Sequence, residues 1–155
     1  MEVLLDQRWT LTPEQSRTNL IVPFTVPHAF ERLEFRFQYG PKVVDDPEII
    51  LRGVTECMEK YVRPQDRPAE IRVGDYDPPV NFVTLSVDCG GEYVGCAHRH
   101  APEGTVVIGR DDATFGFFRR PVEAGDWRVV LNVHAIVAGT VDYHLVITGK
   151  EAGEA

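Results

Sequence analysis

The feature that most constrains the fold is an alternation of apolar and polar side chains in several short segments. Between Asn81 and Asp88, every second position is apolar, at Val83, Leu85 and Val87. A period of two is typical of a β-strand that buries one face. The same kind of segment recurs at 19–26, 32–39, 105–109, 127–135 and 141–147, and residues 2–10 are expected to add an edge strand. The chain is therefore predicted to be all-β.

Turn residues separate these segments. Thirteen glycines and eleven prolines are spread through 155 residues, which suits many short strands in one domain. We expect a β-sandwich or jelly roll of about seven to eight strands. The domain is predicted to span residues 1–149, with a tail at 150–155. The last two strands are expected to pair as a hairpin around Ala138-Gly139-Thr140.

One segment has the signature of a helix. Asp46 is a good N-cap, Pro47 suits the first turn, and Glu48 adds an early acidic residue. Apolar residues follow at helical spacing: Ile50, Val54, Cys57, Met58 and Tyr61. We therefore predict one amphipathic helix within an insertion at about residues 41–79, covering an end or edge of the sandwich.

Charge and composition limit the function classes. The 24 acidic and 16 basic residues give a net charge of −8, which disfavours binding to nucleic acids and to anionic membrane surfaces. No apolar run approaches the ~20 residues of a membrane helix. Acidic Glu2 and Asp6 stand where a signal peptide carries basic residues, so a cytoplasmic protein with free thiols is expected.

The densest cluster of potential metal ligands lies at residues 89–103. It holds two cysteines, the His98-Arg99-His100 triplet and Glu103, all side-chain types that bind zinc or a related metal. The alternative is structural. Gly90-Gly91 makes a turn, the cysteines join the core, and the histidines lie in a solvated loop. The structural interpretation is favoured, and the metal site remains an alternative.

Two further groups of residues are candidates for contact with a partner. In the expected hairpin, His134 lies opposite His144, and both point away from the core together with Asn132. Such a pair can titrate, bind a metal or contact a partner. The second group is Phe117, Phe118 and Arg119. No nucleophile or nucleotide motif indicates catalysis.

Several segments of the second half occur in a recognisable order. They are Val107-Ile108-Gly109, Asp112-Ala113-Thr114-Phe115-Gly116-Phe117, Pro121-Val122-Glu123-Ala124-Gly125-Asp126-Trp127 and Val141-Asp142-Tyr143-His144-Leu145. This order resembles the β-sandwich domain that precedes the catalytic domain of CehA/McbA family metallohydrolases, with its D-A-T-P-G-Y segment, P-A-G-x-W turn and x-Y-x-V strand. The resemblance covers residues 80–149 well and the first 40 loosely. The sequence departs from it at Phe115, where proline is usual, and at Arg119-Arg120.

The resemblance implies an accessory role. In that family a PHP (polymerase and histidinol phosphatase) domain follows the sandwich and carries a metal-binding D-x-H-x-H motif, which this sequence lacks. We therefore expect a non-catalytic binding module without a cofactor. Its partner would be a separately encoded metallohydrolase or a second copy of the chain. The residues expected to face the partner are Asn132, His134, His144, Phe117, Phe118 and Arg119.

A second resemblance gives the alternative. Cupins are small β-barrels that hold a metal on an H-x-H pair, a glutamate and a later histidine. Here these would be His98, His100, Glu103 and His134, binding one transition metal ion such as iron, manganese or nickel. The spacing departs from that family, because Glu103 follows His100 too closely. A third possibility is binding of carbohydrate or peptide through Tyr39, Tyr76 and Tyr93.

Overall fold

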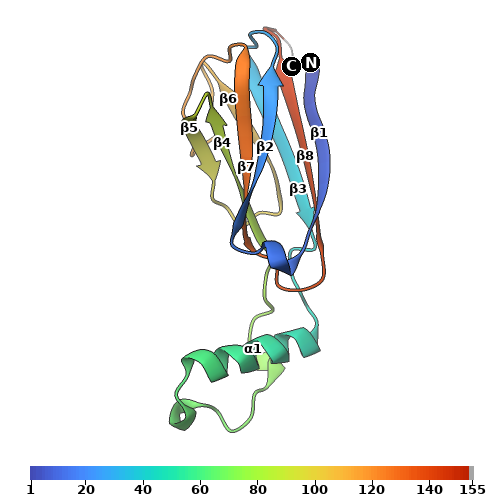
Figure 1. Cartoon of the computed structure of the whole chain (residues 1–155), viewed down its shortest axis with the longest axis vertical. Helices are drawn as coiled ribbons and strands as arrows, with labels where there is room; N and C mark the ends of the chain where they lie inside the picture. Colours follow the sequence, from blue (N-terminus) through green and yellow to red (C-terminus); the bar gives the residue numbers. More distant parts are fainter. Residues whose placement is uncertain (154–155) are drawn as a thin grey trace.

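The computed structural model describes residues 1–153 and forms two four-stranded antiparallel sheets around one core (Figure 1). Sheet A contains, in spatial order, β1 (Glu2–Leu11), β8 (Val141–Lys150), β3 (Arg32–Gly40) and β6 (Glu103–Gly109). Sheet B contains β2 (Thr18–Val26), β7 (Gly125–Ala135), β4 (Phe82–Cys89) and β5 (Glu92–Ala97). The predicted all-β sandwich with one inserted helix is confirmed.

The strand pairing follows a simple rule. Each strand pairs with its counterpart counted from the other end of the chain, which gives the ladders β1·β8, β2·β7, β3·β6 and β4·β5. The β3·β8 and β4·β7 ladders then complete the two sheets. This is the arrangement of a jelly roll, in which one long double-stranded ribbon is wound into a sandwich.

The alternating apolar residues meet between the two sheets. In sheet A, Phe35 and Leu145 have no exposed surface, and Leu131 of sheet B faces them from the other side. Phe24 packs edge-on against Phe35, with ring centroids 5.9 Å apart. Burial of each such side chain contributes about 1.5–3 kcal/mol, so this layer supplies most of the stability of the sandwich.

The expected hairpin between β7 and β8 is wrong. The two strands belong to different sheets, and residues 136–140 cross the end of the sandwich between them. Ile136 is buried there and its N–H donates to Ser16 Oγ at 2.9 Å. Both strands direct the same parity of residues into the core, so alternation alone is satisfied equally by paired strands and by strands that face each other.

Strand β5 was not predicted. It forms a hairpin with β4 around Gly90-Gly91, whose φ angles are +55° and +84°. A two-residue hairpin turn of this type needs positive φ at both positions, which glycine adopts freely. The predicted turn at Gly90-Gly91 is present, and Cys96 is buried while Cys89 is half-buried.

We call residues 41–81, between β3 and β4, the arm. It contains α1 (Pro47–Tyr61) and the short 3-10 turns η2 (Pro64–Asp66) and η3 (Val73–Asp75). The predicted cap is present, since the Glu48 N–H donates to Asp46 Oδ1 at 2.9 Å. The helix does not cover the sandwich, however. It lies crosswise beyond one end, held by two connecting segments (Figure 1).

The arm is rooted at Asn81, which is fully buried. Its Nδ2 donates to the Pro41 carbonyl at 2.9 Å, and its Oδ1 accepts from the Val137 N–H at 2.8 Å. The Nζ of Lys42 donates to the Asn81 carbonyl and to Tyr39 Oη. One side chain therefore ties both ends of the arm to the connection between β7 and β8.

One predicted boundary needs a correction. Lys150 is the last residue of β8, so the predicted tail at 150–155 begins one residue later, and residues 154 and 155 lie outside the described part of the chain. A third 3-10 turn, η1 (Pro13–Gln15), joins β1 to β2. Within residues 1–153, no helix combines the length and the apolar character needed to cross a membrane.

Candidate functional site

We call residues 113–119 the clip, because they join the edge strands of the two sheets. On the β6 side, the Thr114 N–H donates to the Val107 carbonyl at 2.9 Å, and Thr114 Oγ1 accepts from the Val107 N–H at 2.8 Å. On the β5 side, the Cys96 N–H donates to the Gly116 carbonyl at 3.1 Å. The D-A-T-F-G-F segment therefore closes one side of the sandwich.

The clip places only part of the predicted contact group at the surface. Phe117 is 9% exposed and belongs to the core, so its assignment as a partner-facing residue is wrong. Phe118, at 67%, and Arg119 are exposed as expected. Phe115, at 89%, is the most exposed large apolar residue of the described chain and was not predicted. Its neighbours Thr114 and Gly116 are hydrogen-bonded to β6 and β5, and the Phe115 side chain between them points into the solvent.

The outer face of sheet B contains a hollow of about 440 Å³, which we call the sheet B hollow. It receives side chains from all four strands of the sheet. Asn132 of β7 lies beside Ser86 of β4, with 3.4 Å between Nδ2 and Oγ. The lining residues are Arg17, Thr18, Asn19, Ser86, Tyr93, Cys96, His98, Asn132, Val133 and His134.

Three histidines gather at this face. His134 lies 2.9 Å from the Thr84 hydroxyl through Nε2, and its ring stacks on Phe82 with centroids 4.5 Å apart. His100 stacks on the same phenyl ring at 4.1 Å. Burial lowers the pKa of His134, and the nearby charges of His98 and His100 lower it further. These imidazoles are therefore neighbours, as the cupin resemblance requires.

The fourth predicted ligand lies elsewhere. Glu103 begins β6 and projects from sheet A, while His134 projects from sheet B. Among residues 1–153, no three histidine, cysteine, aspartate or glutamate side chains are placed to hold a metal ion together. The structure thus brings His98, His100 and His134 to one face and leaves Glu103 out of the group.

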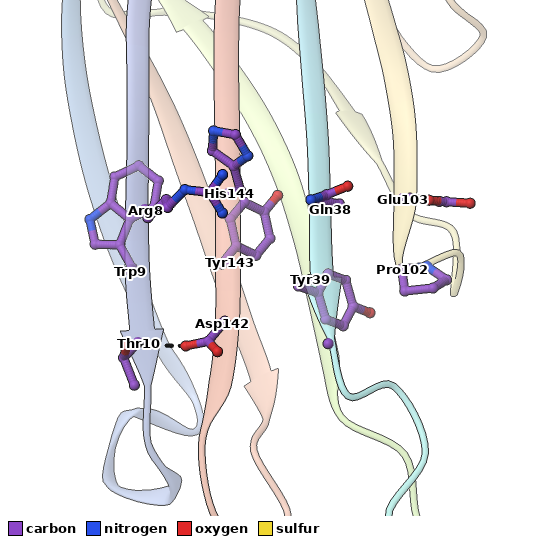
Figure 2. Close-up of a pocket in the computed structure, with 11 residues that line it drawn as sticks. Arg8, Trp9, Thr10, Gln38, Tyr39, Pro102, Glu103, Asp142, Tyr143 and His144 are labelled. Carbon is purple, nitrogen blue, oxygen red and sulfur yellow. Dashed lines mark hydrogen bonds between the residues drawn. The ribbon is translucent and has the colours of Figure 1, made fainter.

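The outer face of sheet A contains a larger hollow of about 610 Å³, the sheet A hollow (Figure 2). Its floor is crossed by one polar row, with Arg8, His144, Gln38 and Glu103 contributed by the four strands in register. Asp142 accepts a hydrogen bond from Thr10 at 3.2 Å in the next row. This hollow carries charges of both signs.

The predicted histidine pair is separated by the sandwich. His144 projects from sheet A, where its Nε2 lies 2.7 Å from Asp6 Oδ1, whereas His134 projects from sheet B. The correction follows from the missing hairpin, because facing strands of a sandwich direct their outward residues to opposite sides. Asn132 and His134 share a face, and His144 does not belong with them.

The arm contains a mainly apolar hollow of about 430 Å³, which we call the arm groove. It runs along α1, where only Ile50 is buried, and Tyr61 at one end of the helix is 69% exposed. The lining residues are Ile49, Ile50, Gly53, Val54, Cys57, Met58, Tyr61, Val62, Tyr76, Asp77, Pro79 and Val137. The helical spacing predicted this apolar face, but it did not indicate that the face would lie away from the sandwich, exposed to solvent.

The three tyrosines considered for sugar or peptide binding are scattered. Tyr39 is buried beneath the sheet A hollow, Tyr93 is 58% exposed at the sheet B hollow, and Tyr76 lines the arm groove. They do not form one aromatic surface.

No protein-family model matches this sequence, and neither does any curated protein. The resemblance to the CehA/McbA sandwich domain therefore rests on its quoted residues alone. In the structure those residues have structural roles: Thr114 and Gly116 build the clip, and Trp127 and Tyr143 are buried in the core.

Proposed function

We propose that this chain is a non-catalytic binding module. The arm lies beyond one end of the sandwich, and its groove binds an apolar segment of a partner protein. The observation that carries the proposal is the state of α1. This 15-residue amphipathic helix lines an open groove with its apolar face instead of packing that face on the sandwich.

Helix energetics support an external partner. Isolated helices shorter than ~12–15 residues are marginal in water, and helices in proteins gain most of their stability by packing an amphipathic face. Here Tyr76, Pro79 and Val137 supply the facing side of the groove, and much of the helix remains exposed. Met58 adds an unbranched side chain that adapts to the shape of a bound segment.

Charge indicates the kind of partner. The arm, residues 41–81, holds nine acidic and six basic side chains, a net charge of −3 in a chain whose total is −8. Two arms of this kind repel each other, so a different protein with basic residues beside its apolar segment fits better than a second copy. A separately encoded metallohydrolase, the partner implied by the resemblance, is one candidate of this kind.

Photo-crosslinking followed by a binding measurement tests the proposal. A photo-reactive phenylalanine analogue replaces Tyr61 in the arm or, as a matched control, Tyr93 on sheet B, two tyrosines of similar exposure. The protein captured at position 61 is then purified and titrated against the wild type, Met58→Glu and the control Ile21→Glu. Ile21 is an exposed apolar residue of the sandwich.

We expect capture at position 61 but not at 93. Met58→Glu should weaken binding about a hundredfold, because a carboxylate buried in an apolar interface loses its hydration without gaining a partner. Ile21→Glu should bind as the wild type does. Failure to capture any protein at position 61, or equal affinity for Met58→Glu with an unchanged helical circular dichroism signal, would contradict the proposal.

A further inference from the structure

The sheet B hollow has an unusual charge for this chain. The whole sequence carries −8, yet none of the ten residues that line this hollow is an aspartate or a glutamate. Its ionisable groups are Arg17, His98 and His134, together with the weakly acidic Tyr93 and Cys96. The sheet A hollow differs, because Glu103 and Asp142 lie among its lining residues. Of these two hollows, the sheet B hollow is electrostatically the better suited to an anion.

Arg17 is held in an uncommon conformation at this hollow. Its φ is +64°, and it is the only residue other than glycine with positive φ among residues 1–153. Branched and long side chains disfavour this left-handed region, which asparagine and glycine tolerate better. The Arg17 guanidinium takes part in no hydrogen bond or ion pair within the described chain. Strain of this kind is concentrated at binding sites.

Other donors around the hollow are also available. The Nδ2 of Asn132 has only long contacts, at 3.4 Å to Ser86 Oγ and 3.5 Å to the Val130 carbonyl. Asn19 lies directly opposite Asn132 in the β2·β7 ladder. Tyr93 adds a ring that is 58% exposed. The hollow therefore combines a free guanidinium, two amides and an aromatic surface.

We propose that the sheet B hollow binds a small ligand that carries an oxyanion, a carboxylate or a phosphate, attached to a flat ring. Arg17 pairs with the oxyanion in bidentate fashion, the amides of Asn19 and Asn132 donate to it, and Tyr93 stacks on the ring. The volume of about 440 Å³ lies in the range of small-ligand sites. This site lies on sheet B and is independent of the arm groove.

A titration with three related probes tests the proposal. Phenyl phosphate, benzoate and uncharged benzyl alcohol share a ring and differ in the oxyanion. The side-chain amide signals of Asn19 and Asn132 are followed by NMR during each titration. Saturable shifts with either anion, absent with benzyl alcohol, are expected, and the tighter of the two anions identifies the oxyanion. No shift with either anion, or equal shifts with benzyl alcohol, overturns the proposal.

Two substitutions separate binding from folding. Arg17→Asn removes the charge and suits the left-handed backbone, so thermal stability should be maintained or raised while affinity falls roughly tenfold or more. Arg8→Asn makes the same change at an exposed arginine of the sheet A hollow and should leave affinity unchanged. Equal affinity for Arg17→Asn and the wild type overturns the proposal.

The pH dependence gives a second readout. The groups that face His134 are the Thr84 hydroxyl, the Phe82 ring, His98 and His100. The Lys42 Nζ lies 5.1 Å from the centroid of the Phe82 ring. None of these groups is a carboxylate, so a bound anion would be the negatively charged partner of a protonated His134. The affinity for benzoate, which stays ionised in this range, should rise as the pH falls below 6.5, and the rise should be smaller in His134→Gln. An affinity independent of pH in the wild type counts against the proposed anion.

Discussion

The sandwich and the arm treat their apolar side chains differently. In the sandwich, the two sheets enclose a single core in which residues such as Leu131 and Ile147 have no exposed surface. In the arm, α1 buries only Ile50 and leaves the rest of its apolar face along an open groove. The sandwich buries its apolar residues in a common core, whereas those of the arm line a groove that is open to solvent.

The largest expected effect comes from the residue that joins the two regions. In Asn81→Ala, the Pro41 carbonyl and the Val137 N–H lose the partner that the fully buried Asn81 side chain supplies through two part-buried hydrogen bonds. At about 1–3 kcal/mol for each unsatisfied group, unfolding should become easier by about 4 kcal/mol in chemical denaturation. Asn132→Ala, which removes only long hydrogen bonds, is the control and should cost less than about 1 kcal/mol. Similar losses of stability in the two variants would show that the hydrogen bonds of Asn81 contribute no more to stability than those of the surface residue Asn132.

A substitution in the clip tests the tight packing of the sandwich. Gly116 has a φ of +96°, and a Cβ there would lie 2.8 Å from the Cys96 carbonyl oxygen. Gly116→Ala should therefore destabilise the protein by about 2–3 kcal/mol, from backbone strain and the clash together. Gly53→Ala in α1, where a Cβ meets nothing within 4 Å, is the matched change in the arm. Gly53→Ala should leave the thermal stability unchanged or raise it. A loss of stability equal to that of Gly116→Ala would contradict the difference in packing between the sandwich and the arm.

Removal of the arm tests the contrast directly. A short glycine-serine linker replaces residues 45–78, so that the hydrogen bond from the Val44 N–H to the Pro79 carbonyl is kept. Because the core contains no residue of the deleted segment, the stability of the sandwich should change by no more than about 1 kcal/mol. Circular dichroism should show loss of the helical signal with the strand signal and cooperative melting preserved. A shortened chain that fails to melt cooperatively would mean that the two regions fold as one.

The smallest effect concerns acid stability of the sandwich. Burial, together with His98 and His100, holds the pKa of His134 below its ordinary value of 6.5. The unfolded chain therefore binds the proton more readily, and stability is greatest above this value and declines as the pH falls through it. Denaturation between about pH 7.5 and 5.5 should show this decline. His134→Gln, which can keep a contact with Thr84, should flatten it, and an unchanged slope would assign the decline to other groups.

The sequence predicted the parts of the fold that depend on local periodicity. The strand at residues 81–88 and the helix that begins after Asp46 were found because the burial of one face leaves a period in the chain. Pairing between strands leaves no such mark. The β7–β8 hairpin was wrong for this reason, since both strands satisfy the alternation while lying in different sheets. Strand β5 was missed because it lacks the alternation: Val94, Gly95 and Cys96 are buried in succession.

The candidate sites depended even more on tertiary structure. His98 and His134 were singled out by residue type, and the fold brings them to one hollow. Arg17 was missed, since its positive φ follows from the turn between η1 and β2 and has no sequence signal in an arginine. Phe117 was misassigned because its neighbours, and not its own identity, decide which aromatic residue of the clip turns inward.

The hydrogen bonds of Asn81 also bear on how chains of this architecture diverge. Departure and return of the inserted segment occur side by side, at Lys42 and Asn81, whose backbones are joined at 2.8 Å. None of the strand ladders includes a residue between these two positions. The segment between Lys42 and Asn81 can therefore be exchanged for another without a change in the strand pairing. A jelly roll of this kind can acquire a new recognition element by replacing one segment, and protein engineers can graft a foreign loop at the same point.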